Sequence, residues 1–196
     1  MKKHTTFFLL LLCGCYSAFG QIKYEKEERI QKEELPVAVV QLLPLMKANA
    51  KRIRYYREFD GQSISYEVKF KKHGAHFSVE FNQEGVLEDV EVLVAKSALP
   101  TVVLETVKTH FQSVKLTRIQ KQFVHPQGVN PVHTLRAVFG KYSSVKHDVL
   151  TKSAYEIVVS GKTQNGYQQF EVLVAPSGKL LKKSTILTKD YEHVVY

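Results

Sequence analysis

Apolar and polar residues alternate along several stretches of the chain, a pattern that predicts β-strands. The clearest stretches are ISYEVKF at 64–70, AHFSVEF at 75–81 and VLEDVEVLVA at 86–95. The basic segment KRIRYYREF at 51–59 precedes them and is predicted to be the first strand of the same sheet. Each strand has one apolar face and one polar face, which is typical of an antiparallel sheet covered on one side only.

Two similar segments predict helices ahead of the strands. ELPVAVVQLL at 34–43 and ALPTVVLETV at 98–107 share a Leu-Pro opening and the same apolar spacing. Proline suits the first turn of a helix, where its missing N–H costs nothing, so Pro36 and Pro100 mark helix starts. Pro44 is predicted to kink or end the first helix near Leu43.

The repetition predicts a fold of the α+β class, built from two tandem units. Each unit is a helix packed on an antiparallel sheet of about four strands, the first spanning 34–96 and the second 97–196. The helices are about 64 residues apart and the last strands about 93, so the second unit carries an insertion near 120–148. The insertion is predicted to form a strand over 132–141 or a long loop.

The first twenty residues have the pattern of an export signal. Lys2 and Lys3 precede a short apolar run, and Ala18-Phe19-Gly20 fits a cleavage site. We therefore predict a signal peptide over 1–20, a periplasmic or secreted chain without a transmembrane span, and a solvated, charged lead-in over 21–33 that belongs to no core. Alternatively, Leu12-Cys13-Gly14-Cys15 resembles a lipobox, in which case Cys15 is lipidated and the protein is a lipoprotein at the membrane surface.

The Leu-Pro-x-x-Val helix start, the Tyr-Glu-Val strand and the glycine turn in VEFNQEGVL resemble the PepSY-like family of exported bacterial proteins, which are often described as β-lactamase-inhibitor-like. The resemblance covers residues 34–95 well and 98–187 less well. It implies tandem α+β units outside the cytoplasm, no cofactor, and a binding or inhibitory role.

No motif for catalysis, cofactor binding or metal binding stands out. The 196 residues carry a formal charge of +9, but the basic residues are spread along the chain, so no nucleic-acid partner is predicted. No Gly-x-Ser-x-Gly elbow or His-Glu-x-x-His helix occurs. Glu88, Asp89 and Glu91 are interpreted as the solvated side of a strand. We therefore predict no enzyme activity, although spatially assembled sites are not visible in a sequence.

The remaining candidate for function is a surface that binds a partner. Arginine and tyrosine are frequent anchors of protein interfaces, and the basic first strand is rich in both. The same charges would also keep an edge strand soluble. We predict an exported, non-catalytic protein that binds a protein or envelope component, with inhibition of an enzyme as one form of that role. A lipid-anchored structural component and an unrecognised enzyme are the alternatives. The predicted partner-binding residues are Arg54, Tyr56, Arg57, Phe59 and Asp60.

Overall fold

A computed structural model of the chain describes residues 21–23, 26–59, 61, 63–111, 113–142, 152–163 and 166–186. The predicted signal peptide, and Cys15 within it, lie outside these ranges, as does Asp60. The elements in chain order are β1 (Gln21–Lys23), β2 (Lys26–Ile30), the short 3-10 turn η1 (Lys32–Glu34), α1 (Val37–Lys47), β3 (Lys51–Phe59), β4 (Ile64–Lys72), β5 (Ala75–Asn82), β6 (Leu87–Leu93), η2 (Lys96–Ala98), α2 (Thr101–His110), β7 (Val114–Val124), α3 (Pro131–Lys141), β8 (Ser153–Thr163), β9 (Gly166–Val174) and β10 (Leu180–Ile186).

The described strands form one continuous sheet of ten strands, in the order β1, β10, β9, β8, β7, β6, β5, β4, β3, β2. All neighbours pair antiparallel except β1 and β10, which run parallel. The predicted fold of two tandem units, each a helix packed on an antiparallel sheet of about four strands, is therefore wrong; whether the two units share one sheet was left open by the sequence. Strand β6 pairs directly with β7, from Asp89 opposite Val124 to Leu93 opposite Gln120, so the hydrogen-bonded ladder does not stop midway.

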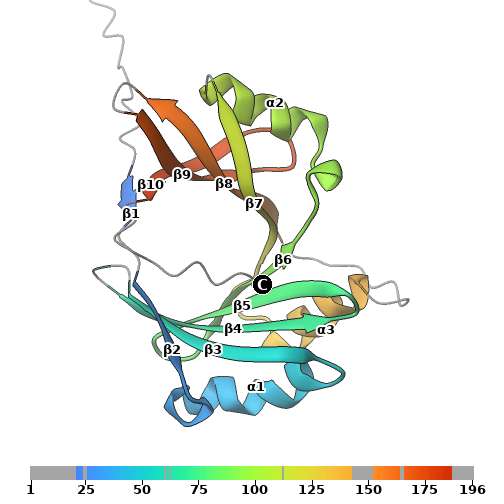
Figure 1. The fold of residues 1–196 in the computed structure, drawn as a ribbon. Coiled ribbons are helices and arrows are strands. Elements are labelled where there is room, and N and C mark those ends of the chain that lie inside the picture. The colour runs from blue at the N-terminus through green and yellow to red at the C-terminus, as the bar shows by residue number, and fades with distance from the viewer. Residues whose placement is uncertain are drawn as a thin grey trace, which may run out of the picture.

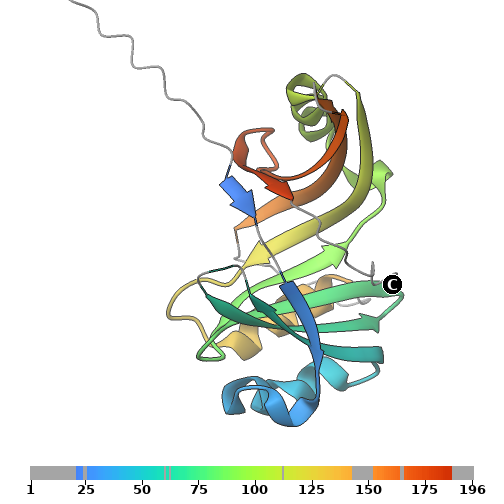
Figure 2. The same ribbon diagram turned by 60° about the vertical axis from the view of Figure 1, so that its left-hand side comes forward.

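The sheet is strongly curved, and the three described helices lie on its convex side (Figure 1). Its edge strands are β1 and β2, which are separated by only two residues along the chain. Figure 2 shows these two strands one after the other on the open side of the curve. The lead-in was predicted to belong to no core, and this is also wrong, because Ile30 at the end of β2 is buried in the core.

Helix α3 corrects the prediction of a strand or a loop in the insertion. Asn130 caps it by accepting a hydrogen bond from the Val132 amide, and Pro131 follows at the first position. The helix packs beside α1. Its Phe139 ring also meets the ring of Phe77 on β5 edge-on, with centroids 5.3 Å apart. Residues 131–141 thus complete the core beneath β4 and β5 although they follow β7 in the chain.

The two helices predicted from the Leu-Pro pattern are present, with one difference. Helix α2 buries Val103 and Val107 against β8 and β9, as the spacing predicts. Helix α1 continues through Pro44 to Lys47 instead of ending near Leu43. Pro44 is exposed, whereas Leu43 and Met46 on either side of it are buried, so packing keeps the chain helical despite the missing N–H.

The turn between β5 and β6 fixes the position of α1 on the sheet. Gly85 has a φ of +80°, and a Cβ added there would lie 2.9 Å from the Cβ of Pro36 at the helix start. Gly74, in the turn between β4 and β5, has a nearly equal φ of +82° and no atom within 4 Å of an added Cβ. Both glycines need the left-handed backbone conformation, but only Gly85 is also closely packed, so substitutions at the two positions distinguish the two effects.

We expect Gly85→Ala to lower the free energy of unfolding by at least about 1 kcal/mol more than Gly74→Ala, because only the first adds a clash to the cost of a left-handed alanine. Urea denaturation of the two variants and the wild type measures the difference. Equal losses would show that the helix is not held by contact with this turn.

Candidate functional site

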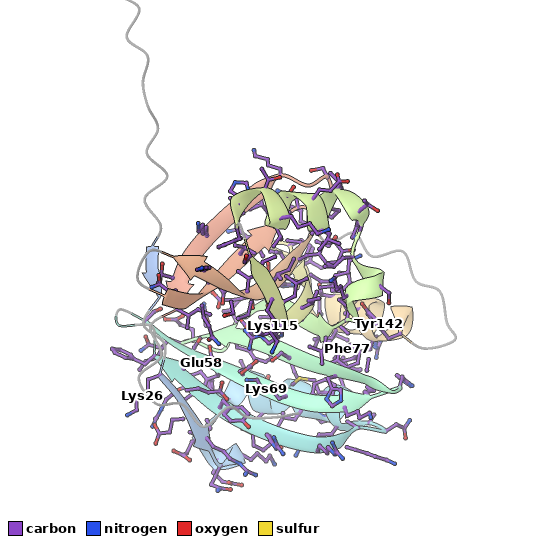
Figure 3. The ribbon with its side chains drawn as sticks, turned by 45° about the horizontal axis from the view of Figure 1, so that its top comes forward. Lys26, Glu58, Lys69, Phe77, Lys115 and Tyr142 are labelled. Atoms are coloured by element: carbon purple, nitrogen blue, oxygen red, sulfur yellow. The ribbon has the colours of Figure 1, made fainter. Side chains whose placement is uncertain are left out.

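The concave face of the sheet is polar and is the candidate site. Because neighbouring strands keep their register, side chains at matching positions from β2 to β9 point to this face, away from the helices. Figure 3 shows two of them, Glu58 and Lys69, on the same part of the sheet. The concave face carries carboxyl groups on seven of these strands, at Glu27, Glu58, Glu67, Glu80, Asp89, Glu91, Glu156 and Glu171.

Lys69 is the buried cation of this face. Its ammonium lies 2.7 Å from Glu67 Oε2 on its own strand and 3.0 Å from Glu27 Oε2 on β2. It also lies 4.7 Å from the centre of the Tyr56 ring on β3. The Ser78 hydroxyl of β5 donates a hydrogen bond to the other oxygen of Glu67. These contacts connect four strands through side chains as well as through the backbone ladder.

A second cluster joins three carboxyl groups in the middle of the sheet. One oxygen from each of Glu80, Asp89 and Glu91 lies within 4.8 Å of the other two. From β7, Gln122 donates to Asp89 Oδ2 at 2.9 Å and Gln120 donates to Glu91 Oε2. The interpretation of Asp89 and Glu91 as solvated is wrong: they are 8% and 3% exposed, because their strand lies in the centre of the curved sheet.

Burial determines the protonation of this cluster. It raises the pKa of Asp89 to about 8, with the charge of Glu156 adding to the effect. It also raises the pKa of Glu80 and of Glu91 well above the usual range, and the neighbouring carboxylates act in the same direction. Around neutral pH the cluster therefore holds protons, which its members can share.

The same spacing of oxygens would suit a hard divalent cation, which prefers carboxylate ligands. Glu27, Glu58 and Glu67 form another such group within 4.8 Å. Lys69 already forms ion pairs with Glu27 and Glu67. In the central cluster, hydrogen bonds from the glutamines of β7 and shared protons stabilise the carboxyl groups. A group of acidic residues does not by itself define a metal site, and the geometry assigns none here.

The predicted partner-binding residues are divided between the two faces by the pleat of β3. Arg54 and Tyr56 point to the concave face, where Arg54 is partly exposed and Tyr56 is buried. Arg57 and Phe59 point to the opposite face, where Arg57 pairs with Glu28 at 2.8 Å and Phe59 is 43% exposed. The structure thus does not bring these four residues together on one surface.

The buried carboxyls were not predicted from the sequence. The available signal was that Glu67, Glu80 and Asp89 fall on the polar side of three consecutive strands joined by short turns. Such an arrangement places them opposite one another across the ladder, as the register shows. The sequence pattern does not predict the curvature of the sheet, which buries these carboxyls.

This architecture places the chain among proteins that have a curved, largely antiparallel sheet with helices on its convex face. Its fold is shared with a DUF2874 family protein from Bacteroides ovatus, at 15% identity over 78% of this chain and 89% of that one, with a TM-score of 0.51. A protein from Bacteroides fragilis described as BLIP-like matches at 14% identity over 81% and 92%, with a TM-score of 0.48.

A third structure, from Bacteroides eggerthii and provisionally described as periplasmic, matches at 15% identity over 76% and 88%, with a TM-score of 0.49. No protein-family model and no curated protein matches the chain. The PepSY-like resemblance therefore stays a prediction. Among the residues that the structure describes, no helix has both the length and the apolar character needed to cross a membrane.

We expect Lys69→Met to lower the free energy of unfolding at pH 7 by about 3 kcal/mol, because it leaves buried carboxylates without their cation. Chemical denaturation measures this loss. Lys115→Met, the same change at an exposed position of β7, serves as the control. The double variant Lys69→Met, Glu67→Gln should recover part of the loss. A loss no larger than that of the control would mean that Lys69 does not stabilise the concave face.

The raised pKa of Asp89 predicts a pH dependence of stability. A carboxyl whose pKa is higher in the folded than in the unfolded state stabilises the fold when protonated, so the free energy of unfolding should fall as pH rises from about 4 to about 8. Asp89→Asn should resemble the wild type near pH 4 and be more stable than it at pH 8. Urea denaturation at both pH values tests this, with Glu105→Gln on the exposed side of α2 as control. Parallel losses in Asp89→Asn and wild type would contradict it.

Proposed function

We propose that the protein is an exported, non-catalytic binding protein that holds a partner protein or envelope component against its concave face. The observation that carries this proposal is the placement of the helices. All three described helices pack on the convex side, in the two apolar cores, and none covers the polar face. A sheet face of this size, with a buried polar centre, is suited to recognition.

The distribution of exposure on the concave face supports this role. Its centre is buried and polar, with Glu67, Lys69 and Glu91 each below 7% exposed. Around the centre lie partly or fully exposed charged side chains, among them Arg54 at one end and Arg118 near the other. Arginine is enriched at protein interfaces because its planar group combines large contact area with several donors.

Export is supported by the signal-like first twenty residues, and the periplasmic description of one structural neighbour is consistent with it. Inhibition of an envelope or secreted enzyme is the form of binding that the β-lactamase-inhibitor-like resemblance implies. The concave face would then act by covering the partner's surface rather than by chemistry of its own.

A matched pair of charge reversals on one strand tests the face. Arg54 points to the concave side and Arg57, three residues later, to the other side. We expect Arg54→Glu to weaken retention of a partner from the envelope fraction by about tenfold or more, and Arg57→Glu to leave it unchanged. Affinity capture on immobilised mature protein, followed by binding measurements with the retained partner, gives both values.

The two variants distinguish binding at the concave face from binding at the convex side. If the Arg57 variant alone loses the partner, binding belongs to the convex side and the proposed face is wrong. If neither variant changes the affinity, the end of the face that contains Arg54 is excluded. Thermal unfolding of both variants shows that any loss is not a loss of folding.

A further inference from the structure

A basic pocket lies at the end of the concave face where β3 begins and the β4–β5 hairpin closes. It is a shallow hollow of about 20 Å³ that opens to solvent. Residues of β3, β4 and β5 line it, and nearly all of them carry basic groups. We call this the basic pocket; its lining consists of Arg52, Arg54, Lys69, Phe70, Lys71 and His76.

The strand register brings like charges together at this pocket. Arg54 lies opposite Lys69, and Lys71 lies opposite both Lys51 on one neighbouring strand and His76 on the other. Directly opposed like charges destabilise a sheet. An arrangement of this kind becomes favourable when an anion binds between the basic groups.

A backbone irregularity places Arg52 at the pocket. The register between β3 and β4 shifts between Lys51 and Arg54, and Arg52 has a φ of +57°. Positive φ is uncommon and unfavourable for a residue other than glycine, because the Cβ then lies too close to the following carbonyl oxygen. Bulges of this type redirect a side chain, and they are frequent beside functional sites. The chain thus retains an unfavourable conformation that adds a guanidinium to the pocket.

Within the described part of the chain, not all cations of the pocket have an acidic partner. Lys69 is paired with Glu27 and Glu67. In contrast, no hydrogen bond or ion pair within the described part of the chain joins Arg52, Arg54 or Lys71 to a carboxylate. Arg52, Lys71 and His76 line the same hollow; burial lowers the pKa of His76, and the charges of Lys71 and Arg52 lower it further.

We propose that the basic pocket is a binding site for a phosphate group, held chiefly by Arg52, Arg54 and Lys71. A guanidinium can donate two parallel hydrogen bonds to a phosphate, and an ammonium adds a mobile point charge. His76 can donate a further bond through one ring nitrogen. This inference does not depend on the proposed partner, because the site should bind inorganic phosphate on its own.

Isothermal titration of the mature protein with inorganic phosphate tests the proposal, with chloride added to keep the ionic strength constant. Arg52→Gly and Lys71→Gln should each weaken phosphate binding by about tenfold or more. Arg57→Gln removes a positive charge from the other face and should leave binding unchanged. Glycine accepts the positive φ at position 52, so Arg52→Gly should unfold at the same temperature as the wild type or higher. Its loss of binding then does not arise from misfolding.

Vesicles separate the two sources of a phosphate group. Binding to vesicles containing phosphatidylglycerol but not to pure phosphatidylcholine, with displacement by inorganic phosphate, would support a lipid headgroup as the ligand. Phosphate binding without vesicle binding would support a free phosphate. Equal heats with phosphate and chloride, or full phosphate binding by both pocket variants, would overturn the proposal.

Discussion

The continuity of one hydrogen-bonded sheet, whose two edges are tied by the same short piece of chain, is the constraint on which the rest of the structure depends. Strand β1 ends at Lys23 on one edge and β2 begins at Lys26 on the other. Three residue steps span at most about 11 Å, so ten strands must curl until their edges almost meet. The helices occupy the convex side, and the polar face becomes the inner wall of the curve.

Curvature changes the chemistry of that inner wall. The polar side of an ordinary two-faced sheet is solvated, and its carboxylates are charged. Here the inward side chains crowd together, and each buried charge needs a partner or a proton. Lys69 supplies a cation for Glu67, the glutamines of β7 donate to Asp89 and Glu91, and protons neutralise the remainder. The curvature of the sheet therefore accounts for the neutral centre of this face.

Local patterns predicted the individual elements better than their assembly. Alternation located β3 to β6, and the Leu-Pro signal located the starts of α1 and α2. Helix α3 was also within reach, since Asn130-Pro131 is a helix start and Leu135, Val138 and Phe139 have helical spacing. The pairing of β6 with β7 was not, because it joins segments about 30 residues apart through backbone atoms that carry no sequence signal. The carboxyls are buried by the curvature of the assembled sheet, so their burial was not predicted either.

The protonated cluster also links recognition to pH. Asp89 and its neighbours hold protons because burial penalises their charged forms. A cationic group brought against the concave face would stabilise the carboxylates, lower their pKa values and release protons. The affinity for such a partner should then rise with pH across the range in which the free cluster titrates, while the cluster's own contribution to folding falls. A cationic group on a bound partner would thus supply the charge that the isolated cluster lacks.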